Sequence, residues 1–199
     1  MFEGVLIPAD ARRAARGVET VIEHGLRPAV AGSLARALQL RALGRVRAPR
    51  RLNDVDVIVE SFGALPASLA GSFLLNHVHP AAAEGQVVVQ LIDESLALRI
   101  DVFRAFGRSL SRAVDVRSTV ALPVLAIEDL RARATAIVYG HLQRRRPLDP
   151  KHVSAMQDLA GLGERDAPNA AWEEHRQGLP GSFDEAHRKA CRLLEQRPE

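Results

Sequence analysis

Three aspartates stand in a pattern that could hold divalent metal ions. Asp54 and Asp56 are separated by one residue at the start of a β-branched stretch, and Asp101 lies inside a second apolar stretch. Side chains alternate across a strand, so Asp54 and Asp56 would share a face, and a neighbouring strand could bring Asp101 beside them. Such a cluster repels itself unless a cation neutralises it, and Mg²⁺ prefers carboxylate, water and phosphate oxygens. The pattern therefore predicts a magnesium site.

The same three residues suit phosphoryl transfer. Two metal ions about 3.5–4 Å apart can stabilise both the attacking and the leaving oxygen. Asp54 and Asp56 would bridge two Mg²⁺ ions, with Mn²⁺ as an alternative metal. Asp101 would bind the ion that activates an acceptor hydroxyl and could also serve as its general base. We expect all three aspartates to be metal ligands and catalytic residues.

Gly32 and Ser33 form a second candidate feature, at a predicted turn from strand to helix. Gly32 would let the backbone approach a phosphate closely. The Ser33 hydroxyl and the first free N–H groups of the following helix could bind the β- and γ-phosphates of a nucleotide. Each feature alone is usually ordinary turn or surface chemistry, so the functional prediction depends on their occurring together and in order.

The elements that must position these residues follow from hydrophobic periodicity. Helices are predicted at residues 9–25, 34–44, 65–76, 127–142, 151–162 and 183–194. Strands are predicted at residues 27–31, 54–59, 86–92, 96–103 and 123–126, with a hairpin turn at 93–95. Ser182 and Glu185 match a capping box before the last helix. We expect a catalytic domain at residues 1–120 and a mainly helical region at 121–199.

The order of these motifs resembles the motif order of a known protein family. A Gly-Ser pair at 32–33, the D-x-D at 54–56 and a single Asp101 within an apolar strand follow the pattern of DNA polymerase beta-like nucleotidyltransferases. The resemblance covers roughly residues 28–103. It is strongest to the minimal bacterial enzymes and the AbiEii-type toxin nucleotidyltransferases, in which an Arg precedes the D-x-D, as Arg50 does here, and Asp-Leu opens a later helix, as at 129–130.

This resemblance implies an α/β (α+β) nucleotidyltransferase fold, with a mixed β-sheet flanked by helices and a helical C-terminal extension. It implies transfer of a nucleoside monophosphate from an NTP such as ATP to a hydroxyl, with release of pyrophosphate. Arg50 and Lys151 would neutralise the triphosphate. The acceptor could be tRNA or another RNA, a protein or a small molecule, and a cognate antitoxin protein could be a partner.

Three positions depart from the pattern of such relatives. Leu52 stands where a Ser or Thr is common, Ala134 where a Lys is common, and Ala155 where an acidic residue is common. These departures motivate an alternative from another class, a catalytically inactive nucleotide-sensing or partner-binding protein with the same fold. A third reading is an aminoglycoside-type small-molecule modifier, for which an acidic acceptor cleft is expected.

Composition limits the remaining classes. The 199 residues carry a formal charge of +3, which permits a polyanionic partner and slightly favours RNA. Only 4% of residues are aromatic, which disfavours base recognition by stacking. The single Cys191 excludes an intrachain disulfide framework and fits a cytoplasmic protein. No apolar run approaches the length of a membrane span, so we expect no membrane partner.

The other conspicuous residues have simpler interpretations. The run Arg144–Arg146 is typical of a solvated loop after a helix. His77 and His79 lack a third metal ligand nearby in sequence, so no zinc is assigned. Trp172 is interpreted as the packing anchor of a C-terminal helix, and Cys191 as a small half-buried residue.

Overall fold

Two units make up the chain, and each buries hydrophobic residues of its own. The computed structural model describes residues 2–78, 88–116, 122–160, 162 and 168–196. The first unit comprises Met1–Ala105 and Leu110–Leu125, and the second comprises Phe106–Ser109 and Ala126–Glu199. The main boundary thus falls at Leu125, and the short segment Phe106–Ser109 belongs with the C-terminal unit.

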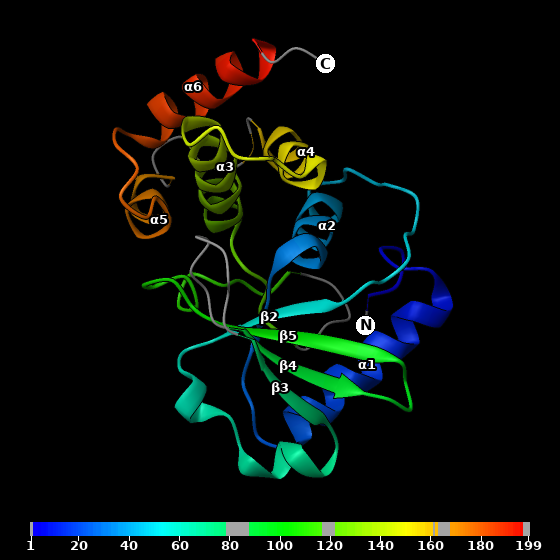
Figure 1. Ribbon diagram of the computed structural model, residues 1–199. Coiled ribbons are helices and arrows are strands. Elements are labelled where there is room, and N and C mark those ends of the chain that lie inside the picture. Colours follow the sequence, from blue (N-terminus) through cyan, green and yellow to red (C-terminus); the bar gives the residue numbers. More distant parts are fainter. Residues whose placement is uncertain (1, 79–87, 117–121, 161, 163–167, 197–199) are drawn as a thin grey trace. The chain divides into compact units, whose positions relative to one another are not determined.

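A five-stranded mixed sheet organises the first unit (Figure 1). Its strands, in sequence order, are β1 (Ala29–Val30), β2 (Val55–Val59), β3 (Leu74–Val78), β4 (Val88–Asp93) and β5 (Leu98–Arg104). They lie in the order β1-β2-β5-β4-β3. Only the central β2–β5 pair is parallel, and the other neighbours are antiparallel. The expected α+β class with a mixed sheet flanked by helices is confirmed.

Helices α1 (Pro8–Glu23) and α2 (Gly32–Ala42) approach the sheet from different faces (Figure 1). Gly17 of α1 packs so closely on β5 that an added Cβ would lie 2.2 Å from Leu98 Cδ2. Leu98 and Ile100 point to one face of β5, so Asp101 points to the other. Helix α1 therefore covers the apolar face of the sheet. The start of α2, at Gly32, packs against Asp56 on the other face.

The helix predicted at residues 65–76 is wrong. The segment forms two 3₁₀ turns, η1 (Phe62–Ala64) and η2 (Ala67–Gly71), followed by the edge strand β3. Leu69 and Phe73 are buried, and their spacing of four residues imitates a helical stripe. Hydrogen bonding of β3 to β4 overrides this local preference.

Two smaller strand predictions also change. The strand expected at residues 123–126 is reduced to isolated bridges, in which Val124 pairs with Val30 and with Val114. The predicted β4 began at residue 86, and residues 86 and 87 lie outside the described part of the chain. The remaining strand and helix predictions match observed elements, with shifted ends.

The second unit is helical. It contains α3 (Ile127–Gln143), α4 (Pro150–Leu159), α5 (Pro168–His175) and α6 (Phe183–Glu195). Helix α3 packs against the other three, and α5 was not predicted. Buried Trp172 donates its indole N–H to the Gly181 carbonyl at 2.8 Å and meets the Phe183 ring edge-on at 6.0 Å, so its role as a packing anchor is confirmed.

Other local predictions in this unit hold. The capping box of Ser182 and Glu185 is present, and half-buried Cys191 packs against the helical core. The residues Arg144–Arg146 are exposed just after α3, as expected of a solvated loop. Among the described residues, no helix is long and apolar enough to cross a membrane.

Candidate active site

A row of polar side chains crosses four strands of the sheet. Asn76 of β3 pairs in register with Gln90 of β4, Gln90 with Asp101 of β5, and Asp101 with Asp56 of β2. Registered neighbours on adjacent strands project to the same face, so these four residues share one surface. The sequence prediction that Asp101 lies beside the D-x-D pair is therefore met by the strand register.

The amide side chains in this row orient Asp101. Gln90 Nε2 donates to Asp101 Oδ1 at 3.2 Å, and Asn76 Nδ2 donates to Gln90 Oε1 at 3.1 Å. Sequence reasoning missed both amides. Assigning residues 65–76 to a helix removed Asn76 from the sheet, but the alternation of residues along 88–93 could have placed Gln90 on a polar face.

Gly32 brings the start of α2 against Asp56. Its φ of +60° lies in the left-handed region, and an added Cβ would lie 1.8 Å from Asp56 Oδ2. The backbone is tied down on both sides: Ala31 N–H donates to the Asp56 carbonyl at 2.8 Å, and the Ser33 N–H donates to the Asp56 side chain. Gly32 and Ser33 therefore adjoin the D-x-D, as the sequence predicted.

A positive charge lies inside the aspartate cluster. The Arg99 guanidinium contacts Asp54 Oδ2 through Nη2 and lies 3.1 Å from Asp101 Oδ1 through Nε. Asp54 directly precedes β2, and the Arg99 side chain is 44% exposed. Within the described residues, no three acidic, His or Cys side chains are arranged to hold a metal ion as they stand. Arg99 is the counter-charge instead.

The chemistry of the donors nevertheless suits a hard cation. Burial, followed by the charges of Asp54 and Asp101, raises the pKa of Asp56 to about 7 from an ordinary 3.8, although Arg99 and the Ser33 N–H oppose the rise. Burial and Asp54 also raise the pKa of Asp101, against Arg99 and Gln90. Added positive charge would help carboxyl groups to ionise when burial and neighbouring carboxylates raise their pKa values.

Arg50 and Ser33 form the other half of the predicted phosphate site. Arg50 Nη2 donates to Ser33 Oγ at 2.9 Å, which joins the loop before β2 to the start of α2. Burial lowers the pKa of Arg50, while Asp54 and Asp56 raise it. The structure therefore brings Gly32, Ser33 and Arg50 together with the acidic residues.

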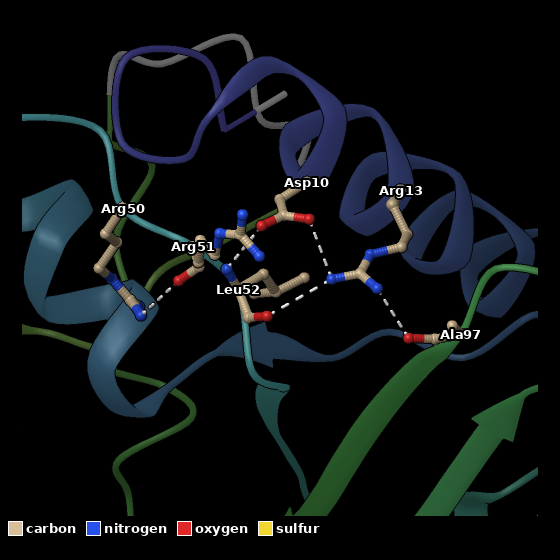
Figure 2. Close-up of polar contacts among 6 residues, drawn as sticks. All are labelled: Asp10, Arg13, Arg50, Arg51, Leu52 and Ala97. Atoms are coloured by element: carbon tan, nitrogen blue, oxygen red, sulfur yellow. Dashed lines mark hydrogen bonds and ion pairs between the residues drawn. The ribbon is translucent and has the colours of Figure 1, made fainter.

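Two residues of α1 hold the segment that leads into the D-x-D and β2 (Figure 2). Asp10 Oδ2 accepts the Leu52 N–H at 2.9 Å, and Arg13 donates to the Leu52 carbonyl at 3.4 Å and the Ala97 carbonyl at 2.8 Å. Asp10 and Arg13 also pair with each other at 3.0 Å. The Leu52 side chain is buried, so this position belongs to the core.

Most of the remaining predicted positions lie in the second unit. Lys151 is in the first turn of α4, exposed and 3.1 Å from Asp149, and its role at a triphosphate stays a prediction. Asp129 is buried and pairs with His175 at 2.9 Å, so it is part of the helical core. Ala134 is buried and Ala155 packs against the same core. His77 lies on β3, and His79 lies outside the described residues.

Comparison with known proteins adds no family to this geometry. No family model matches the chain, and no curated protein matches it either.

Proposed function

We propose that this protein is a metal-dependent nucleotidyltransferase, which moves a nucleoside monophosphate from an NTP to a hydroxyl acceptor and releases pyrophosphate. One observation carries the proposal: Asp56 and Asp101 are registered neighbours on parallel strands, with Gly32 packed directly against Asp56. A carboxylate pair beside a glycine turn and the N-terminus of a helix suits a nucleotide phosphate and its metal ions.

The side chains have distinct roles in this proposal. Asp54, Asp56 and Asp101 would hold Mg²⁺ or Mn²⁺, which when bound would neutralise phosphate charge and make the acceptor hydroxyl more acidic. Ser33 and Arg50 bind the β- and γ-phosphates and hold the leaving pyrophosphate. Asp101 accepts the proton of the acceptor hydroxyl as the general base. Gln90 holds the Asp101 carboxylate in its orientation through a hydrogen bond to Oδ1.

The cellular setting is part of the same proposal. A lone cysteine fits a reducing cytoplasm. The acceptor is RNA or tRNA by preference, because the chain has an excess of arginine over acidic charge. An antitoxin protein is the proposed regulatory partner if the enzyme acts as a toxin.

A second candidate is a nucleotide sensor without turnover. The observation in its favour is Arg99, which contacts both Asp54 and Asp101 and so supplies the positive charge that a metal would otherwise bring. Tight NTP binding that needs no divalent metal, together with no release of pyrophosphate in the presence of any acceptor, would favour this sensor over the enzyme.

Label transfer from NTP is expected to depend on Mg²⁺ and on Asp54. The purified protein is incubated with each α-labelled NTP, Mg²⁺ and total RNA or protein extract. Asp54→Asn should lose transfer because one metal-binding oxygen becomes an amide nitrogen, which cannot bind a cation. Asp115→Asn, at an exposed aspartate of the same unit, is the matched control and should retain transfer. Full activity of Asp54→Asn would contradict the assignment.

Arg99→Gln is expected to tighten Mg²⁺ binding by roughly threefold to tenfold. The ion pairs of Arg99 with the carboxylates contribute about 1 kcal/mol and compete with Mg²⁺. Without Arg99, the carboxylates interact more strongly with the metal. Isothermal titration of the NTP-free protein with Mg²⁺ measures this change. Arg104→Gln is the control, since Arg104 lies on the same strand but alternates to the other face. Weaker Mg²⁺ binding by Arg99→Gln would contradict this prediction and would show that Arg99 orients the carboxylates for the metal.

A further inference from the structure

A basic pocket lies beside the proposed phosphate site, within the first unit. It has a volume of about 260 Å³ and is formed by α2, residues 4–5 and the loop at 45–50. Its polar lining consists of Ser33 and five arginines, namely Arg36, Arg41, Arg45, Arg47 and Arg50. No Asp or Glu is among the described residues that line it. We call this feature the arginine pocket.

The helical repeat aligns the pocket along α2. Ser33, Arg36 and Arg41 share one face of the helix with Ala37 and Leu40, and from Ser33 to Arg41 that face is about 12 Å long. Arg41, Arg45 and Arg47 are exposed, while Ser33 and Arg50 are half-buried. Arg41 also donates to the Gly4 carbonyl at 3.3 Å, which joins the helix to the N-terminal wall. The charge therefore extends away from Ser33 toward solvent.

We propose that the arginine pocket binds the backbone phosphates of an RNA acceptor, an inference that rests on the proposed function for its placement beside the nucleotide. A triphosphate at Ser33 and Arg50 would use only one end of the pocket. Arg41 and Arg45 are exposed and suit a second polyanion with spaced charges, because guanidinium groups match phosphate oxygens in pairs. The small aromatic content also favours recognition through the backbone over stacking of bases.

The test measures RNA binding without turnover. Anisotropy of a short labelled single-stranded RNA is followed at several salt concentrations, in EDTA so that no transfer occurs. The variant Arg41→Ala/Arg45→Ala/Arg47→Ala should weaken binding about tenfold or more and reduce the salt slope by about 2, because each phosphate contact releases counterions. The matched control Arg144→Ala/Arg145→Ala/Arg146→Ala removes the same charge from an exposed loop of the second unit and should change binding by about twofold or less.

Four results would overturn the inference. The first is that the unaltered protein does not bind RNA, and the second is that the pocket and loop variants lose the same RNA affinity. The third is that polyglutamate displaces the labelled RNA as well as unlabelled RNA does, and the fourth is that the pocket variant no longer binds NTP. The last result would assign the pocket to the nucleotide, and calorimetry with an NTP and Mg²⁺ detects it. RNA binding that depends on the pocket, without any label transfer, would support the inference and refute the proposed enzymatic function alone. Circular dichroism checks that each variant is folded.

Discussion

Asp56→Asn is expected to abolish nucleotidyl transfer and at the same time to stabilise the metal-free protein. Asp56 is the member of the cluster that adjoins both the Gly32 turn and the registered Asp101. An amide in its place keeps the size and can still accept the Ser33 N–H through its oxygen, but it loses the charge that would hold a metal. We expect activity to fall roughly a thousandfold or more.

The stability gain follows from the pKa of Asp56. This pKa is about 7 in the folded chain against 3.8 for an ordinary aspartate, so the folded state binds a proton that the unfolded state has released. Wild-type stability should therefore fall as pH rises from about 4 to about 7, and the ionised carboxylate then costs on the order of 1–4 kcal/mol. Asparagine carries no such cost, so the variant should be more stable above pH 7.

Chemical denaturation between pH 4 and pH 8 tests this result, without divalent metal. The wild-type curve should decline with pH, and Asp56→Asn should flatten it, although the raised pKa of Asp101 leaves a residual slope of the same sign. Asp115→Asn should follow the wild type, since that side chain is exposed. Asp56→Asn that is less stable than wild type at pH 8 would contradict the electrostatic account, and retained activity would contradict the catalytic one.

The sequence predicted the acidic site because its members lie on strongly patterned strands. The β-branched run after Asp54 and the alternation around Asp101 predict strands by local chemistry alone. The order of the strands, which makes β2 and β5 direct neighbours, is a long-range property that periodicity does not predict. Gly32 and Ser33 were found because a strand-to-helix turn has a local sequence signature.

The residues that were missed act through tertiary contacts. Arg99 is two positions before Asp101 on the same face of β5, so strand alternation could have indicated it, but its contact with Asp54 needs the parallel pairing of β2 and β5. Asp10 and Arg13 reach the backbone of Leu52 from a helix that is distant in sequence. No local pattern predicts such a contact. The false helix at 65–76 similarly reflects local spacing that lost to strand pairing.

Gly32→Ala is expected to destabilise the protein by roughly 3 kcal/mol and to remove nucleotide binding. At a φ of +60° the new side chain meets left-handed backbone strain, and its Cβ would lie 1.8 Å from Asp56 Oδ2 and 2.6 Å from Asp56 Cγ. Either Asp56 must leave the cluster or the start of α2 must move away from it. Both changes separate Ser33 from the aspartates, so phosphate and metal can no longer be held together.

Gly44→Ala is a control that measures the cost of backbone strain without a steric clash. Gly44 lies just after the same helix with a φ of +74°, but nothing lies within 4 Å of an added Cβ. It should cost only about 1 kcal/mol, the penalty for a left-handed alanine. The cost of Gly32→Ala should also shrink in an Asp56→Ala background, where the colliding carboxylate is absent. Denaturation of the four variants measures both comparisons. Equal costs for Gly32→Ala and Gly44→Ala would show that α2 and Asp56 are not in close contact, and the proposed phosphate site would then lose its geometric basis.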